Sequence, residues 1–218
     1  MGSAAPPLDL VVVVPVRSLE GAKTRLGEAL DPEERLELTA RLLVRVVGAV
    51  RTWGRNRETI VVSPDPAVLE LAVRLGARAL RQASSGLNEA LEEARSDPSV
   101  ASAGALLVLH ADLPAISPGA LDRVVDAADG ATIAATAPVA VVITDRRGEG
   151  TNALLLRPPG LLPFAFGPGS HRAHLEAARA AGAAAISLTD HELSFDLDTP
   201  DDLLALDGVT AGDERIVP

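Results

Sequence analysis

Apolar and polar positions fall into blocks along the first half of the chain. Short, uninterrupted apolar runs are typical of strands that are buried on both faces of a parallel sheet. We expect such strands at residues 8–15, 58–63, 77–81 and 106–109. Stretches with helical character separate them, and this alternation predicts a parallel sheet with right-handed crossover connections.

Helix start and stop signals support this alternation. Asp31 opens a capping box with a proline directly behind it, and Gly54 is a natural stop, so the first helix is expected at residues 32–53. Further helices are expected after Asp65, near residues 89–95 and after Ser117.

The second half of the chain is patterned differently. Its apolar stretches are short, and the polar turn at residues 145–150 predicts a pair of antiparallel strands. The expected strands are residues 132–136, 139–144, 151–156, 186–188 and 193–197, and the expected helices are residues 171–181 and 201–206. We therefore expect an α/β fold with a mostly parallel central sheet, helices on both faces and antiparallel strands in the second half.

No linker and no repeat divides the 218 residues, which suit a single domain. We expect this domain at residues 8–208, between a disordered leader at residues 1–7 and a tail at residues 209–218. Cysteine is absent, which excludes disulfides and thiolate metal sites. No apolar run is long enough to span a bilayer, and the formal net charge of −10 argues against a nucleic-acid partner. We expect a soluble, cytoplasmic protein.

Lys23 is the only lysine in a chain whose other cationic side chains are arginines. It lies in the loop after the first expected strand, together with Arg17 and Arg25. Ligands of open α/β sheets bind beyond the carboxyl ends of the strands, and cations in such a loop can hold a polyphosphate. The loop has neither the GxxxxGK[ST] nor the GxGxxG pattern. Phosphate binding is favoured over a solvated basic loop.

Three aspartates are candidates for a metal site. Asp112 follows the apolar run at residues 106–109, and Asp196 and Asp198 lie two residues apart in FDLDTP. On a strand, that spacing directs both carboxylates to one face. With Asp112 they could hold Mg²⁺, which prefers oxygen ligands and shares phosphate oxygens of its substrates. The alternative is local, with Asp112 opening a turn and Asp198 or Thr199 capping the last helix.

Two glycine-containing loops and a histidine pair are further candidates. In FGPGS, backbone amides at a helix start could bind an anion, or Ser170 could simply cap the helix. GEGTN is either a hairpin turn or a loop whose Thr151 and Asn152 face the site. His171 and His174 are spaced like a ligand pair, but surface or packing roles are favoured because no third nitrogen or thiol ligand is nearby.

The motifs, taken in order, resemble those of a known family. They are AKTRL at residues 22–26, GLNEAL at 86–91, ADLP at 111–114, GTNAL at 150–154, FGPGS at 166–170 with His174 behind it, and FDLDTPDDL at 195–203. The set resembles the 2-phospho-L-lactate guanylyltransferases and their relatives that use phosphoenolpyruvate, which act in the biosynthesis of coenzyme F-420. The resemblance covers nearly the whole chain and implies a Rossmann-like nucleotidyltransferase fold.

The resemblance also implies roles for the matching residues. Catalysis would rest on Lys23, Arg25 and Asp112. Mg²⁺ would be coordinated by Asp112, Asp196 and Asp198. The nucleotide would be bound by Lys23, Arg25 and Asn88, with Arg17 from the same basic loop. The acceptor would be bound by Thr151, Gly167 and Ser170. One departure from the wider superfamily is that AKTRL replaces its glycine-rich first loop.

The implied reaction joins two anions. A phosphate oxygen of the acceptor, a small phosphorylated carboxylic acid, would attack the α-phosphorus of GTP and release pyrophosphate. A phosphate monoester, whose second pKa is about 6, is already ionised at neutral pH and needs no general base. The sequence leaves open which acid is used (2-phospho-L-lactate, phosphoenolpyruvate or 3-phosphoglycerate) and whether the protein is a monomer or a homodimer. The alternatives are a sugar phosphate or molybdopterin as acceptor, and a GTP-binding domain without catalysis.

Overall fold

The computed structural model describes residues 8–19, 23–131 and 137–209. The expected leader at residues 1–7, the expected strand at residues 132–136 and nearly all of the expected tail lie outside these residues. Among the described residues, no helix is both long enough and apolar enough to cross a membrane.

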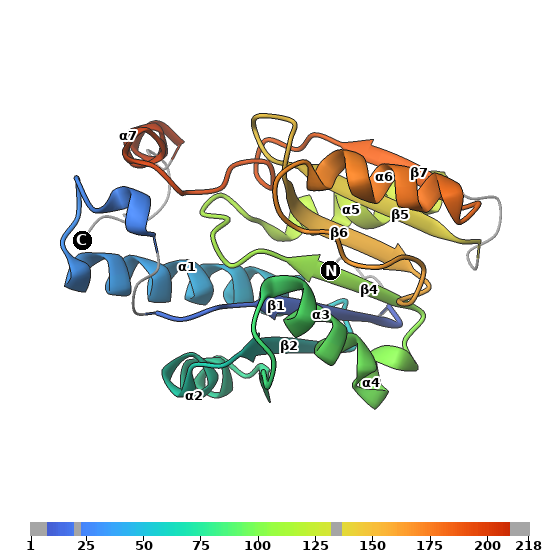
Figure 1. Ribbon diagram of the computed structural model, residues 1–218, viewed down its shortest axis with the longest axis horizontal. Helices are drawn as coiled ribbons and strands as arrows, with labels where there is room; N and C mark the ends of the chain where they lie inside the picture. Colours follow the sequence, from blue (N-terminus) through green and yellow to red (C-terminus); the bar gives the residue numbers. More distant parts are fainter. Residues whose placement is uncertain (1–7, 20–22, 132–136, 210–218) are drawn as a thin grey trace, which may run out of the picture.

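The described strands form one seven-stranded sheet in the order β3-β2-β1-β4-β6-β5-β7 (Figure 1). They are β1 (Leu10–Pro15), β2 (Glu58–Ser63), β3 (Arg78–Arg81), β4 (Ala105–Leu109), β5 (Val139–Thr144), β6 (Thr151–Arg157) and β7 (Ala184–Leu188). All neighbouring pairs are parallel except those that β6 makes with β4 and β5. The first residues of β6 therefore lie at the same edge as the carboxyl ends of the other strands.

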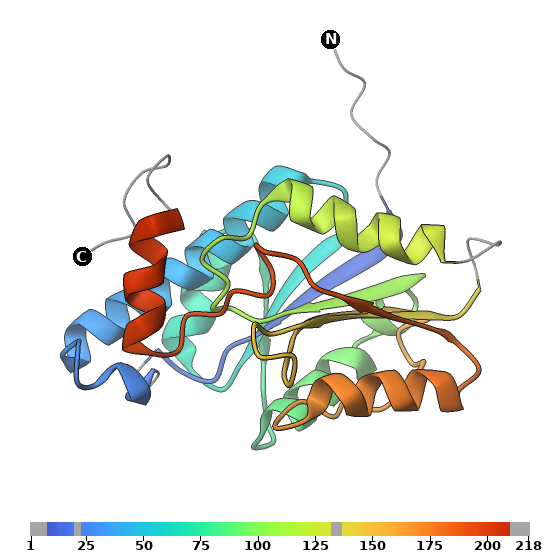
Figure 2. The same ribbon diagram turned by 90° about the horizontal axis from the view of Figure 1, so that it is seen from above.

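Helices cover both faces of the sheet (Figure 2). They are α1 (Pro32–Trp53), α2 (Pro66–Arg74), α3 (Leu87–Ser96), α4 (Pro98–Ala101), α5 (Pro118–Gly130), α6 (Ser170–Ala180) and α7 (Pro200–Val209), with a 3₁₀ turn η1 at Thr24–Leu26. Residues of α1, α2 and α5 pack into the core on one face, and residues of α3, α4 and α6 pack into the core on the other. The expected α/β architecture is confirmed, although the short α4 was not anticipated.

Local signals form the helix ends as the sequence predicts. The Asp31 carboxylate accepts hydrogen bonds from the amides of Glu33 and Glu34, and the Glu34 carboxylate accepts one from the amide of Asp31. Gly54 ends α1 with a left-handed φ of 62°, which costs glycine little because it has no Cβ. Ser117 caps α5 by accepting from the amide of Ala120.

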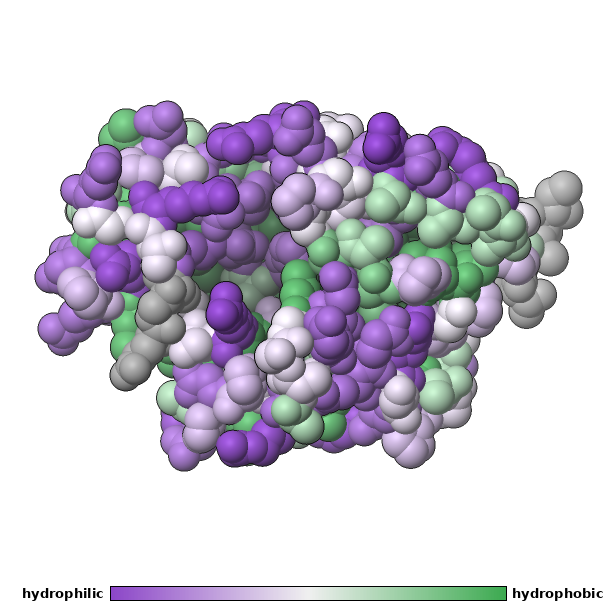
Figure 3. All heavy atoms as spheres, viewed as in Figure 1, coloured by the Kyte–Doolittle hydropathy of each residue, from purple (hydrophilic) through white to green (hydrophobic). Residues whose placement is uncertain are grey.

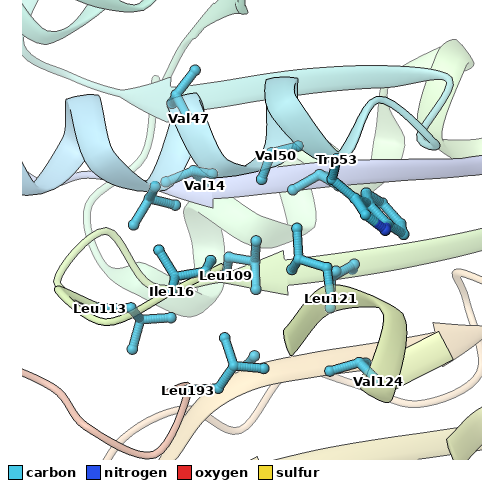
Figure 4. Close-up of a cluster of buried hydrophobic side chains, with 14 of the residues drawn as sticks. Val14, Val47, Val50, Trp53, Leu109, Leu113, Ile116, Leu121, Val124 and Leu193 are labelled. Atoms are coloured by element: carbon cyan, nitrogen blue, oxygen red, sulfur yellow. The ribbon is translucent and has the colours of Figure 1, made fainter. Parts of the chain in front are cut away.

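Alternate residues of each central strand supply the two main cores. Val12 and Val14 of β1 face the α1–α5 side, whereas Val11 and Val13 face the α3–α6 side, and all four are fully buried. Figure 4 shows aliphatic side chains of α1, β4 and α5 meeting on the first of these sides. Burial of each such side chain contributes about 1.5–3 kcal/mol, so the sheet is a rigid platform for the loops at its edge.

A third, smaller core lies beyond the carboxyl edge of the sheet. It consists of Leu26, Leu38, Leu42, Phe195, Leu197 and Leu206. These residues come from η1, α1, the segment before α7 and α7 itself. The cluster holds the basic loop after β1 against the FDLDTP segment, although the two are far apart in the sequence.

One expected strand is wrong. Residues 193–197 are irregular, although Leu193, Phe195 and Leu197 are all buried, as is Ser194 between them. Phe195 and Leu197 pack into the third core, and the segment pairs with no strand of the described sheet. The strand argument for directing Asp196 and Asp198 to one face therefore fails, and tertiary contacts orient them instead.

Candidate active site

The candidate residues gather at the edge of the sheet where six of the seven described strands end and β6 begins. Asp112 follows β4, the basic loop follows β1, and Thr151 opens β6. Figure 3 shows a hollow rimmed largely by hydrophilic side chains on one face of the molecule. The arrangement agrees with the rule that open α/β sheets bind ligands beyond the carboxyl ends of their strands.

Lys23 joins two of the three candidate metal ligands. Its Nζ lies 2.6 Å from Asp112 Oδ2 and 2.6 Å from Asp198 Oδ1, and its side chain is only 9% exposed. Its backbone is left-handed with φ 54°, an uncommon conformation for a residue with a Cβ. Burial opposes the charge on Lys23, but the carboxylates of Asp112 and Asp198 outweigh burial and raise its pKa above the usual value.

The pKa values of the carboxylates in this cluster are shifted in different directions. Burial opposes ionisation of Asp112, yet Lys23 and His110 hold its pKa below the usual value. For Asp196, burial and the nearby charges of Asp112 and Asp198 raise the pKa, although Asn152 Nδ2 donates to its Oδ1 across 3.3 Å. Asp112 Oδ1 is buried and has no hydrogen-bond partner in the described structure. The cluster therefore has more negative charge and more acceptor atoms than Lys23 satisfies.

Hydrogen bonds from distant elements hold the irregular FDLDTP segment in place. The amide of Leu197 donates to the carbonyl of Asp112 across 3.1 Å, and Asn152 Nδ2 donates to the carbonyl of Leu193. Because Asn152 is on β6 and Asp112 follows β4, two central strands orient this segment. Neither contact could be read from the sequence pattern of the segment itself.

Asp202, rather than Asp198, organises the start of α7. Its Oδ2 accepts hydrogen bonds from the amides of Asp198 and Thr199 and from the Thr199 hydroxyl, and the residue is 6% exposed. Arg146, in the turn between β5 and β6, pairs with Asp202 Oδ1 and lies over the Phe195 ring. Of the two residues considered as caps of this helix, Asp198 instead accepts from Lys23, whereas Thr199 directly precedes α7 and its carbonyl accepts from the amides of Asp202 and Leu203.

Two cavities lie at this edge of the sheet, and one of them is lined by Asp196 and Asp198. One, of about 340 Å³, is lined by Arg25, Asp145, Arg146, Arg147, Asp196, Asp198, Thr199 and Asp202. The other, of about 410 Å³, lies at the ends of β1, β2 and β3 and is lined by Pro15, Val16, Arg17, Pro64, Gln82, Ser84, Ser85, Gly86, Leu87 and Ala90. Arg17 and Arg25 thus line different cavities, and Lys23 lies on the aspartates, so the three cations do not form one cluster.

The opposite side of the site is uncharged. Thr151 is buried, and its Oγ1 lies 3.1 Å from Nδ1 of the fully buried His174. The amide of Ala165 donates to His174 Nε2 across 3.0 Å. Burial lowers the pKa of His174 to about 4, with His110 and His171 acting in the same direction, so the ring is neutral at physiological pH. Of the surface or packing roles expected for the histidine pair, the burial of His174 agrees with packing, and its ring also makes these two hydrogen bonds.

Asn88 fixes the first residue of the FGPGS loop. Asn88 on α3 donates to the carbonyl of Phe166 and accepts from its amide, so its side chain contacts the loop backbone. Gly167 has φ 132°, and Gly169, with φ 73°, occupies the position that Ser170 was considered for at the start of α6. Ser170 is instead the buried first residue of that helix. The nucleotide role of Asn88 and the acceptor roles of Gly167 and Ser170 remain predictions.

The donor set fits a divalent cation. No group of three or more His, Cys, Asp or Glu side chains within the described residues is already arranged to hold a metal ion. The ammonium of Lys23, however, lies between the carboxylates of Asp112 and Asp198 as a cation between two oxygen ligands. The unpartnered Asp112 Oδ1 adds a further oxygen. Hard divalent cations select such carboxylate oxygens, so these residues suit Mg²⁺.

Sequence reasoning missed four contributors to this site. They are Asn152, which was left open, and Arg146, Asp202 and His174, which were given no part in it. Asn152 and His174 lie within or beside the recognised motifs, and Asp202 lies within FDLDTPDDL, so motif membership was an available signal for them. Arg146 had none, since its ion pair with Asp202 spans 56 residues.

Comparison with known proteins gives a consistent picture. Residues 10–213 match the model of a family described as "Guanylyl transferase CofC like". A phosphoenolpyruvate guanylyltransferase of Rubrobacter xylanophilus is 50% identical over 200 residues, which cover 92% of this chain and 94% of that protein. A protein of the same name from Sphaerobacter thermophilus is 43% identical over 201 residues, covering 92% and 94% of the two chains.

Solved structures of low sequence identity share the fold. A nucleotidyl transferase from Methanothermobacter thermautotroptrophicus superposes with a TM-score of 0.62 at 20% identity, covering 90% of this chain and 95% of that one. CMP:2-keto-3-deoxy-manno-octonic acid synthetase, solved with CTP, has a TM-score of 0.61 at 15% identity and covers 93% and 98% of the two chains. The expected nucleotidyltransferase fold is therefore confirmed.

Proposed function

The chain belongs to the family of CofC-like guanylyl transferases, and from this premise we propose that it transfers GMP from GTP to a small phosphorylated carboxylic acid. The acceptor would be phosphoenolpyruvate or 2-phospho-L-lactate, and pyrophosphate would be released, in coenzyme F-420 biosynthesis. The structural observation that supports this chemistry best is the pair of carboxylates, Asp112 and Asp198, that meet the ammonium of Lys23 at the carboxyl edge of the sheet. This edge is where a triphosphate binds in open α/β sheets.

The nucleotide would occupy the cavity of about 410 Å³ at the ends of β1, β2 and β3. Its lining combines aliphatic surface with polar groups such as Gln82 and Ser84, which suits a flat base with hydrogen-bonding edges. Arg17 at the rim of this cavity would pair with phosphate oxygens. The triphosphate would then extend from this cavity towards Lys23 and Arg25.

Mg²⁺ would be held by Asp112, Asp196 and Asp198. When bound, it supplies charge neutralisation at the phosphoryl oxygens and helps to align the attacking and leaving groups. The raised pKa of Asp196, caused by burial and by its acidic neighbours, supports a site that gains from an added cation. Lys23 would leave the aspartates for the triphosphate, where its compact charge on a flexible stem suits phosphate oxygens.

The acceptor would bind between the aspartates and the uncharged side of the site. Thr151, the amides of the FGPGS loop and Ser170 would contact its carboxylate and phosphate. No residue has to remove a proton from the acceptor, because a phosphate monoester with a second pKa of about 6 is ionised at neutral pH. The neutral, fully hydrogen-bonded His174 agrees with a site that lacks a general base. We further propose a cytoplasmic monomer or homodimer.

The test is pyrophosphate release with GTP and with ATP, each against phosphoenolpyruvate, 2-phospho-L-lactate, 3-phosphoglycerate, a sugar phosphate and molybdopterin. We expect release with GTP and one of the first two acids, and loss of release when EDTA removes divalent cations. Release with a sugar phosphate or molybdopterin alone would reassign the acceptor. GTP binding without release for any acceptor would contradict transferase function.

A further inference from the structure

His174 makes two hydrogen bonds whose directions can be worked out from chemistry alone. The ring nitrogen Nε2 lies 3.0 Å from the backbone nitrogen of Ala165, and the ring nitrogen Nδ1 lies 3.1 Å from the hydroxyl oxygen of Thr151. A backbone N–H can only donate, so Nε2 must accept and cannot carry a proton. A neutral imidazole carries one proton, which must then be on Nδ1.

The proton on Nδ1 determines what the hydroxyl of Thr151 can do. Nδ1–H donates to Thr151 Oγ1, so the hydroxyl acts as an acceptor towards His174. Within the described part of the chain Thr151 Oγ1 has no other side-chain hydrogen bond, and the hydroxyl proton is left to donate elsewhere. Thr151 opens β6 at the edge of the sheet that Asp112 and Asp196 share. That leaves the proton for an acceptor atom of the ligand that the proposed function places against Thr151.

The surroundings of His174 preserve this arrangement. The side chain is 0% exposed, and the Phe166 ring meets it edge-on at a centroid distance of 4.8 Å. Protonation would place a second N–H on Nε2, opposite the amide of Ala165, so the fold resists it. Burial, with His110 and His171 nearby, keeps the pKa of the ring at about 4, and the tautomer is stable at neutral pH.

We propose that His174 is a positioning residue that turns the Thr151 hydroxyl into a dedicated hydrogen-bond donor for an anionic oxygen of the phosphorylated acid. The inference rests on the proposed function, because it takes Thr151 to contact the acceptor. It adds a residue that never touches substrate and acts through Thr151. It also predicts a site that selects a ligand oxygen bearing lone pairs and disfavours a ligand group that must itself donate.

The amide side chains of asparagine and glutamine separate the two contacts of His174. In His174→Asn the amide lies near the position of Nδ1 and can still donate to Thr151, whereas in His174→Gln it lies near Nε2 and can still accept from Ala165. We expect His174→Gln to weaken phosphoenolpyruvate or 2-phospho-L-lactate binding about tenfold, because the Thr151 hydroxyl is no longer oriented to donate to the charged ligand, and His174→Asn to weaken it much less. GTP affinity should be unchanged in both.

The measurement is calorimetric titration with each acid and with GTP, in the presence of Mg²⁺. His171→Gln is the matched control, because His171 is a half-buried histidine on the same helix whose ring contacts Ser187. In a Thr151→Val background, His174→Gln should cause no further loss of acid affinity. Equal losses for acid and GTP, or a full additional loss in the Thr151→Val background, would mean that His174 only supports the fold and would overturn the proposal.

NMR of nitrogen-labelled histidine in the wild-type protein tests the tautomer without turnover. The signal absent from His174→Gln should belong to a neutral ring with its proton on Nδ1 at about pH 6. A proton on Nε2, or a charged ring, would refute the inference. If the acids bind in a His174-dependent way but no guanylyl transfer occurs, the proposed function fails and the positioning role stands. If neither acid binds, the positioning role fails as well.

Discussion

The charged side and the uncharged side of this site are built in opposite ways. Lys23, Asp112 and Asp198 come from loops, their charges are close together, and one buried carboxylate oxygen is left without a partner. Thr151 and His174 come from a strand and a helix, are buried, and contact each other as neutral groups. Under the proposed function, the first side would change when cations and a triphosphate bind, whereas the second would already be arranged for its ligand. Variants on the two sides should therefore fail differently.

The largest effect is expected for Asp112→Asn on the charged side. Loss of a central carboxylate should lower kcat/KM about 10³-fold, or about 4 kcal/mol, by weakening the cation that supports phosphoryl chemistry. Pyrophosphate release at fixed Mg²⁺ measures this loss. The exposed Asp126→Asn on α5 removes one carboxylate elsewhere and should have no such effect. An unchanged rate in Asp112→Asn would remove Asp112 from the mechanism.

On the uncharged side, His174→Gln should change how stability depends on pH. The folded protein holds the pKa of His174 at about 4, against 6.5 for the unfolded chain. As the pH falls below the unfolded value the unfolded chain binds the proton first, so stability is lost between about pH 6.5 and pH 4, by on the order of 3 kcal/mol. Urea unfolding across this range should show a smaller loss for His174→Gln than for wild type or His171→Gln. Parallel curves would contradict this.

Lys23→Gln should separate metal binding from turnover. Removing the ammonium from between Asp112 and Asp198 should raise Mn²⁺ affinity in the absence of nucleotide. Turnover should fall about 100-fold, because a cationic contact to the triphosphate is lost. Electron paramagnetic resonance of free and bound Mn²⁺ measures the first effect. Arg25→Gln is the control, because it removes a positive charge nearby but leaves the ammonium of Lys23 between Asp112 and Asp198. Weaker Mn²⁺ binding by Lys23→Gln than by wild type would show that Lys23 does not compete with the metal.

The smallest effect is expected for Asp202→Asn, which acts on the charged side indirectly, through the backbone of its neighbours. Asp202 holds the backbone of Asp198 and Thr199, so the change should loosen the metal ligands and weaken Mn²⁺ binding about tenfold. Asp201→Asn is the control, because Asp201 is exposed and lies on the same turn of α7. If both variants bind Mn²⁺ like the wild type, Asp202 only caps α7.

Much of the fold follows from local chemistry. The predicted bounds of β2 and of α1 match the structure, because a capping box, proline positions and an apolar run determine the backbone locally. The expectation failed at residues 193–197, whose apolar side chains are buried without strand pairing. Burial requires only an apolar neighbour, and for Phe195 and Leu197 the neighbours are residues of η1, α1 and α7 rather than of a strand.

The site shows the same division. Motifs along the sequence identified Lys23, Asp112, Asp198 and Thr151 as candidates, because charge and turn chemistry are visible in the residue types themselves. Only the tertiary structure decided that Lys23 lies on Asp112 and Asp198, which are 89 and 175 residues away from it. The tertiary structure likewise decided that Thr151 contacts a neutral His174. Residue type determines which interactions a side chain can make, whereas packing across the sheet determines which partner comes within reach.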